Sequence, residues 1–191
     1  MYTNWWIIVY MMYYTDVQKN MIKELQKLSY EDYPTISYAE RKRIPYTTAV
    51  VHEVMRHASP NPVIKRKAME DFVIENKYFI EKGTYIVGNL YGLSHDENHW
   101  QDCYNFNPDR FLLPSGELNE SVLNNFLPFG IGARRCIAEG IGIKYAIVIT
   151  ANLFRKFYFY EANDAVNINC TYGMSLTPTY EMAKFKINKN N

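Results

Sequence analysis

Apolar residues recur at intervals of three and four through the first part of the chain, which predicts a helical segment over residues 1–58. Within it, residues 2–28 form two expected helices that meet near Thr15-Asp16, where either side chain could cap the second helix. Residues 46–58 repeat valine and methionine on one face, and Pro45 suits the first turn of that helix.

The hydrophobic pattern then changes along the chain. Residues 59–93 hold short β-branched and aromatic runs broken by Glu-Asn and Lys-Gly, which predicts two or three short strands. Residues 94–113 predict a long ordered loop, and such loops are often functional. A glycine loop at 126–136 completes the segment 94–136. An apolar helix is expected over 137–156, and strands around a turn at Tyr172-Gly173 are expected within 157–191. The pattern predicts a mainly helical fold with small β-sheets, of the α+β class.

Composition narrows the class of protein. The 191 residues suffice for one domain, and 48% of them are hydrophobic, which excludes a disordered chain. The formal net charge of +1 argues against coating of nucleic acid. Cys103, Cys136 and Cys170 are widely spaced and form no Cys-x-x-Cys pair, which disfavours a disulfide scaffold or a structural zinc site and favours a reducing environment.

The apolar stretch NWWIIVYMMYY, residues 4–14, is shorter than the roughly 20 residues that span a bilayer. It also lacks the basic start and the cleavage site of a signal peptide. We therefore expect a buried helix. Because the chain would begin inside that helix without a cap, we also expect a missing N-terminal portion.

One loop carries the chemistry that is easiest to interpret. In LPFGIGARRCIAEG, residues 127–140, Cys136 stands just before the expected helix, whose positive end favours a thiolate. Gly130 and Gly132 allow positive φ angles and close approach of the backbone, and two arginines precede the cysteine. The arrangement suits a thiolate ligand to iron, whereas an isolated cysteine is usually inert packing.

Two further motifs are weak when taken alone. Glu53 and Arg56 are three residues apart on the expected helix, as in an ordinary surface ion pair. The run FNPDRF, residues 106–111, places Arg110 between two phenylalanines and would otherwise be an ordinary proline turn.

The three motifs together, in this order and spacing, resemble the cytochrome P450 family. Its members show a Glu-x-x-Arg helix, a Pro-Glu-Arg-Phe-like meander and a Phe-x-x-Gly-x-Arg-x-Cys loop, and this chain has EVMR at 53–56, PDRF at 108–111 and FGIGARRC at 129–136. The stretch at 78–100 also resembles animal microsomal members, closest in look to the steroid hydroxylase and xenobiotic-metabolising branches. The resemblance covers essentially the whole chain but only the C-terminal part of a family member.

The resemblance implies a site for haem b, iron protoporphyrin IX. Cys136 would be the catalytic axial thiolate on the haem iron, and Phe129 would shield the sulfur. Arg134 and Arg66 would bind the haem propionates. The implied cofactor-binding residues are Arg66, Phe129, Gly130, Arg134, Cys136 and Ala138. Glu53, Arg56 and Arg110 would form a buried structural ion triad.

Some residues depart from the family pattern. Ala138 stands where glycine is usual, Gly142 where alanine is usual, and Cys103 where proline is usual. Segments 59–65 and 172–175 match the borders of the family's substrate pocket, and their small or apolar residues suit a lipophilic substrate.

The resemblance also implies partners and a location. A monooxygenase of this family would hydroxylate a steroid, fatty acid or xenobiotic with O2. Its electrons would come from a flavoprotein of the NADPH-cytochrome P450 reductase type, which carries FAD and FMN. Four cations near the cysteine side of the haem would attract this flavoprotein: Arg135, Lys144, Arg155 and Lys156. A solvated helix end is the simpler interpretation of the last two. The location would be the cytosolic face of the endoplasmic reticulum membrane, and no nucleic-acid partner is expected.

The chain also lacks parts that the family uses. In the family, a long helix crosses the distal face of the haem and carries an acid-alcohol pair that delivers protons to bound oxygen. Residues 3–18 resemble only the end of that helix and the start of the next. The N-terminal half, the membrane anchor and the acid-alcohol pair would therefore precede residue 1. An alternative is therefore a catalytically inactive truncated or partial-gene product with at most haem-binding capacity. A further alternative, a redox or structural protein with Cys136 as a sensor thiol, would not explain the order of the other motifs. We expect uncovered apolar faces to make the isolated chain aggregate or stay molten.

Overall fold

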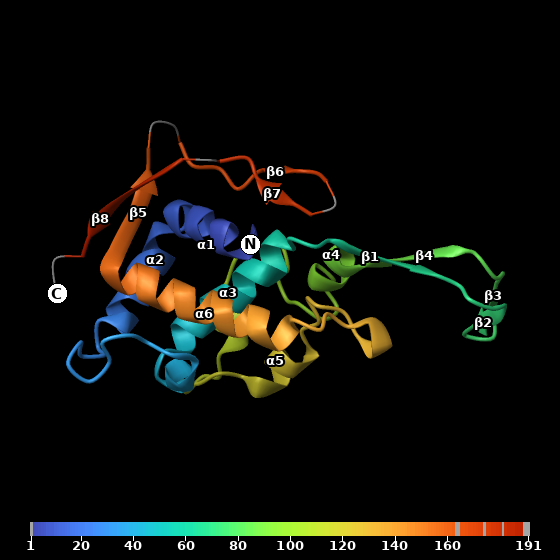
Figure 1. Ribbon diagram of the computed structural model, residues 1–191, viewed down its shortest axis with the longest axis horizontal. Helices are drawn as coiled ribbons and strands as arrows, with labels where there is room; N and C mark the ends of the chain where they lie inside the picture. The colour runs from blue at the N-terminus through green and yellow to red at the C-terminus, as the bar shows by residue number, and fades with distance from the viewer. Residues whose placement is uncertain (1, 163–164, 174, 181, 189–191) are drawn as a thin grey trace.

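The structure is a computed structural model that describes residues 2–162, 165–173, 175–180 and 182–188. Helices form the centre of the molecule, a long two-stranded arm leaves it on one side, and the C-terminal strands lie across another face (Figure 1). The predicted class, mainly helical with small sheets, is therefore confirmed.

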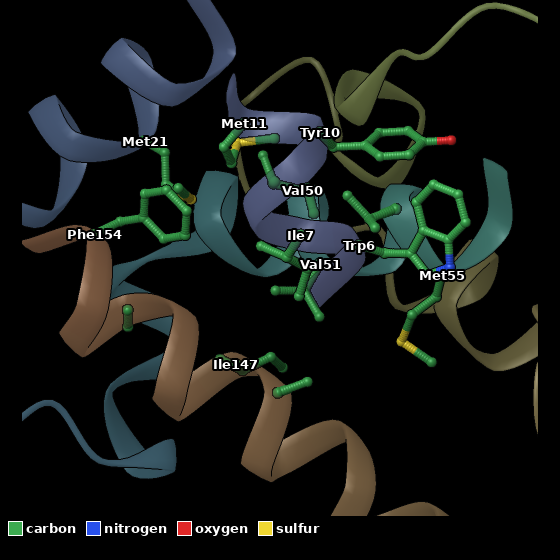
Figure 2. Packing of buried hydrophobic residues seen from close by; sticks show 14 of the residues in the cluster. Trp6, Ile7, Tyr10, Met11, Met21, Val50, Val51, Met55, Ile147 and Phe154 are labelled. Atoms are coloured by element: carbon green, nitrogen blue, oxygen red, sulfur yellow. The ribbon is translucent and has the colours of Figure 1, made fainter. Parts of the chain in front are cut away.

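Four helices enclose the main core. They are α1 (Tyr2–Tyr13), α2 (Thr15–Leu25), α3 (Pro45–Ala58) and α6 (Glu139–Lys156). Figure 2 shows apolar side chains from these helices meeting between the ribbons. Their fully or almost fully buried residues include Trp6, Ile7, Met11, Met21, Val50, Val51, Ile147 and Phe154. Burial of each such side chain contributes roughly 1.5–3 kcal/mol.

The break between α1 and α2 is held by a buried amide. The expected side-chain cap is wrong, because Tyr14 is the N-cap residue and makes no capping bond, while Asp16 pairs with Lys19 on the surface. Gln18, which is fully buried, donates to the carbonyls of Met11 and Phe159 and accepts from the Phe159 amide. The side-chain amide of Gln18 thus joins the bend between α1 and α2 to the backbone of Phe159, in the C-terminal part of the chain.

Helix α3 begins one residue before the predicted range, with Pro45 in its first turn as expected. Its free amides are satisfied from α2, because the Glu24 carboxylate accepts from the amides of Tyr46 and Thr47 at 2.8 Å each. The helix ends at a left-handed Ser59 (φ 40°), immediately before Pro60.

The strand region holds more strands than the two or three expected. β1 (Val63–Lys67) pairs with β4 (Tyr85–Asn89), and β2 (Phe72–Ile74) pairs with β3 (Tyr78–Ile80), both antiparallel. The region ends earlier than residue 93, because Asn89 caps a short helix, α4 (Leu90–Ser94), by accepting from the Gly92 amide.

The remaining elements are short. The 3-10 helices are η1 (Tyr38–Arg43), η2 (Pro108–Phe111) and η3 (Gly132–Arg134), and α5 spans Glu120–Asn125. In the C-terminal part, β5 (Phe157–Glu161) pairs with β8 (Ala183–Ile187) and β6 (Cys170–Thr171) with β7 (Thr177–Pro178), so the turn at Tyr172-Gly173 lies between strands. Residues 189–191 lie outside the described part.

The N-terminal apolar stretch is buried, as predicted, because Trp6, Val9 and Met11 are at most 1% exposed. Among the residues that the structure describes, no helix combines the length and the apolar character needed to cross a membrane. Many apolar side chains are exposed on the arm, including Val73, Phe79 and Val87. The expectation that the isolated chain aggregates stays a prediction.

Two glycines in the first turns of α6 weaken that helix. A methyl group on Gly140 would meet nothing within 4 Å, and one on Gly142 would lie 3.6 Å from the Phe129 ring, an ordinary contact. We therefore expect Gly140→Ala and Gly142→Ala each to raise the free energy of unfolding by roughly 0.5–1 kcal/mol, because alanine is the better helix former. Urea unfolding would measure this, and destabilisation by Gly142→Ala would show that Phe129 cannot accommodate the methyl group.

Candidate functional site

The cysteine loop is a tight turn that presents Cys136 to solvent. Gly130 and Gly132 have φ angles of 75° and 72°, in the left-handed region that favours glycine. The Cys136 amide donates to the carbonyl of Phe129 at 3.1 Å, which closes the loop, and the thiol-bearing residue is exposed. The following helix begins at Glu139 rather than at residue 137, because Ala138 is its N-cap.

Exposed isoleucines stand before and after Cys136 in the sequence. Ile131, Ile137 and Ile141 are 62%, 102% and 72% exposed on either side of Cys136. The sequence analysis did not single out these residues, and Ile137 precedes the helix, whereas Ile141 lies in its first turn. The loop and the start of the helix therefore expose apolar side chains near Cys136 in the sequence.

Two arginines meet at this loop. Strand β1 carries Arg66 to the loop, where its Nη2 donates to the Arg134 carbonyl at 3.2 Å. Its Nη1 donates to the neighbouring Lys65 carbonyl. Within the described residues neither guanidinium has a carboxylate partner, so both charges are available to an anionic group.

The other predicted cofactor-binding residues lie in the same loop. Phe129 packs its ring over the first turn of α6, near Gly142. Gly130 is buried and Ala138 is exposed. An exposed thiol, exposed apolar side chains and two unpaired guanidiniums fit a flat, largely apolar group with acidic side chains, as iron protoporphyrin is.

The segments predicted to border a substrate pocket lie together. The Leu176 amide donates to the Pro60 carbonyl at 2.8 Å, and the Ser175 hydroxyl donates to Asn61 Oδ1 at 3.0 Å. Met174, within the segment 172–175, lies outside the described residues. Ser59, Pro60 and Asn61 also share a small cavity with Phe129.

Glu53, Arg56 and Arg110 form one buried network. Arg56 donates to both Glu53 oxygens, from Nε at 2.7 Å and from Nη2 at 2.8 Å, and neither side chain is exposed. Arg110 Nε donates to Glu53 Oε1 at 3.1 Å, and the Asn107 amide donates to the same oxygen at 2.8 Å. The carboxylate thus joins α3 to the meander, residues 94–111.

The cations expected to attract a reductase are mostly engaged. Arg135 pairs with Glu139, and Lys144 lies over the Tyr38 ring. Arg155 is only 1% exposed and donates to the carbonyls of Leu28 and Tyr33, so it is neither a docking residue nor a solvated helix end. Lys156 is exposed.

The comparisons with known proteins agree with the fold, a mainly helical protein whose glycine loop presents one exposed cysteine. The description "Cytochrome P450" belongs to the family profile that matches residues 2–185. The chain therefore belongs to the cytochrome P450 family, and the family implies a haem cofactor.

Relatives come from several branches. Cytochrome P450 1A1 of Oryzias latipes is 32% identical over 174 residues, which are 90% of this chain and 33% of that protein. Steroid 17-alpha-hydroxylase/17,20 lyase of Rana dybowskii is 34% identical over 154 residues, 80% of this chain and 29% of its own length. A polybrominated aromatic compounds synthase of Pseudoalteromonas luteoviolacea is 33% identical over 177 residues, 91% of this chain and 35% of its own.

A solved structure has the same fold. A zebrafish cytochrome P450 with abiraterone superposes with a TM-score of 0.84 at 27% identity, covering 98% of this chain and 44% of that one. The chain spans about a third of the length of the curated relatives it matches.

Proposed function

We propose that the chain is the C-terminal part of a haem-thiolate monooxygenase that acts on a lipophilic substrate. The observation that carries the proposal is the exposed Cys136 in a closed glycine loop, where Arg66 binds the Arg134 carbonyl. Haem, when bound, would supply the activation of O2 that inserts one oxygen atom into the substrate.

Each residue of the site has a role in this proposal. Cys136 would hold the iron as a thiolate, and the loop amides and Phe129 would limit access of water to the sulfur. Arg66 and Arg134 would orient the cofactor through charge-assisted bonds to its propionates. The Glu53 network would keep the meander, and hence the loop that follows it, in position.

The substrate, the partner and the location rest on the family. The proximity of segments 59–65 and 172–175 supports one pocket border with small and apolar residues, which suits a steroid, a fatty acid or a xenobiotic. Electrons would come from an NADPH-dependent flavoprotein carrying FAD and FMN. Of the four predicted cations, Lys156 is exposed and is the one left to attract it. Membrane association on the cytosolic face of the endoplasmic reticulum is part of the same proposal.

The alternative is a truncated product without activity that at most binds haem. A product without activity would bind haem through Cys136 and leave an added substrate unchanged in the presence of a reductase.

The proposal is tested by a carbon-monoxide difference spectrum of the reduced chain expressed with haem. We expect a strongly red-shifted Soret band, because a thiolate donates electron density to the iron. Cys136→Ser should abolish the band, since serine does not replace the thiolate ligand. Cys170→Ser, at the other partly accessible cysteine, is the matched control and should retain it. A band that survives Cys136→Ser, or its absence from the wild type, would contradict haem binding by this loop.

A further inference from the structure

A histidine joins three separate segments at the end of α3. His57 Nδ1 lies 2.6 Å from the Tyr10 hydroxyl on α1, and its Nε2 lies 2.9 Å from the Tyr104 carbonyl in the meander. A carbonyl only accepts, so Nε2 must carry the proton, and in the neutral ring Nδ1 then accepts from the hydroxyl. Figure 2 shows the Tyr10 hydroxyl pointing outward from the apolar cluster. The bridge therefore requires one tautomer of neutral His57.

A second histidine lies beside the first. The rings of His57 and His95 are 5.8 Å apart, and His95 stacks on Tyr91 with centroids 4.0 Å apart. His95 Nδ1 donates to the Tyr91 carbonyl, and the Cys103 thiol donates to the His95 carbonyl at 3.0 Å. His95 thus anchors the first half of the meander.

The surroundings of this pair are already positive. Arg56 donates to the carbonyls of Ser94 and Cys103, and Arg110 to those of Gln101 and Asn105, while Glu53 is the carboxylate of the network. Two arginines and one glutamate give +1 with both histidines neutral and +3 with both protonated. The titratable and charged groups facing the pair are Tyr10 on α1, Glu53 and Arg56 on α3, Tyr91 on α4, Cys103 and Tyr104 in the meander, and Arg110 on η2.

Burial and charge both oppose protonation of these rings. Burial lowers the pKa of His57 and of His95 below its usual value, and the Arg56 guanidinium lowers both further. The bond from the Tyr10 hydroxyl also opposes protonation of His57, because a hydrogen bond donated to the neutral ring stabilises the neutral form.

We propose that His57 and His95 form an acid-sensitive latch that holds residues 94–107 of the meander against α1 and α3. Protonation of His57 turns Nδ1 from acceptor to donor, so the bond that Tyr10 donates is lost, whereas the Nε2 bond to the Tyr104 carbonyl remains. Protonation also places a third positive charge beside Arg56 and Arg110. The added charge is therefore what opposes the latched state. The segment then leaves the helices, and both histidines reach water.

The direction of the pH dependence follows from linkage. The pKa of each histidine is lower in the latched state than in the open state, where it is close to 6.5. The open state therefore binds more protons below about pH 6.5, and the latch weakens as the pH falls through that value. For each proton taken up on opening, the equilibrium constant between the latched and the open state falls by at most about tenfold per pH unit.

Hydrogen-deuterium exchange of the 191-residue chain between pH 7.5 and 5.5 tests the latch, once rates are corrected for intrinsic exchange. The amides of Trp100, Asn105 and Asn107 are hydrogen-bonded and report on the segment, and α6 serves as the internal reference. We expect the protection of 94–107 to fall by about tenfold or more while that of α6 stays constant.

Variants separate the latch from a general loss of stability. His57→Gln keeps one donor and one acceptor without a titratable ring, so it should reduce the pH dependence of the segment. Tyr10→Phe removes the bond that favours the neutral ring, so it should shift the midpoint to higher pH. His99→Gln changes an exposed histidine in the same segment and should leave the profile unchanged.

Three outcomes would overturn the proposal. They are a parallel loss of protection in α6, an unprotected segment at pH 7.5, and a midpoint that does not move in Tyr10→Phe. The test uses no haem and no substrate, so its result does not depend on the proposed monooxygenase function.

Discussion

Glu53→Gln is expected to lower the free energy of unfolding by about 3–5 kcal/mol, because it leaves a buried arginine without its counter-charge. The Glu53 carboxylate accepts from Arg56, Arg110 and the Asn107 amide, and none of its side chain is exposed. Glutamine keeps the shape but offers one acceptor oxygen and an NH2 group that faces donors. Urea unfolding followed by circular dichroism would measure the loss.

The control for this prediction is an ion pair of the same i, i+3 spacing on the surface. Lys19 and Asp16 lie 2.9 Å apart with side chains 61% and 90% exposed, so Lys19→Ala should leave the unfolding midpoint unchanged. If Glu53→Gln and Lys19→Ala lowered the free energy of unfolding equally, burial of the Glu53 ion pair would not increase its contribution to stability. A wild type without a cooperative transition would contradict the prediction and confirm the molten state expected from the exposed apolar faces.

Short-range signals account for what the sequence predicted about the fold. The repeat of valine and methionine, with Pro45 in the first turn, predicted the helix at 46–58, which the structure begins one residue earlier, at Pro45. The Glu-Asn break in the strand region became a turn in which Glu75 and Asn76 have φ angles of 51° and 54°. The number of strands was underestimated because β2 and β3 have three residues each, too few for an alternating pattern.

Long-range contacts account for what the sequence did not reveal. Arg155 looked like a solvated helix end, but its bonding partners Leu28 and Tyr33 are more than 120 residues away along the chain. Gln18 looked like an ordinary polar helix residue, yet it is buried against Phe159, 141 residues away. Periodicity describes which face of a helix is apolar, but it cannot show which distant segment brings acceptors to a polar side chain.

In the candidate site, too, sequence motifs predicted some features, and others depend on long-range contacts. The motifs predicted the Glu53 network, whose bonds the structure shows. The roles of Cys136 and Arg66, which the resemblance implies, stay predictions. The structure adds that Arg66 contacts the Arg134 carbonyl and that the isoleucines before and after Cys136 are exposed. Those features depend on how β1 and the cysteine loop approach each other, which no single motif specifies.

Phe111→Ala is expected to cost about 3–5 kcal/mol, because it removes a fully buried ring from an aromatic cluster. The Phe111 ring lies 5.6 Å, between centroids, from each of three others, on Trp100, Phe126 and His52. Its neighbour Arg110 binds Glu53, so collapse of the cluster would also disturb the buried network. The expected result is a lower urea midpoint with an unchanged slope.

Phe79→Ala is the matched control, because that ring is 62% exposed on β3, and its effect should stay within about 0.5 kcal/mol. Phe111→Leu should fall between the two, since leucine fills part of the cavity. If Phe111→Ala and Phe79→Ala shifted the midpoint equally, the meander would not be packed against α3 in solution. The cysteine loop that follows it would then lack the support on which the proposed thiolate site depends.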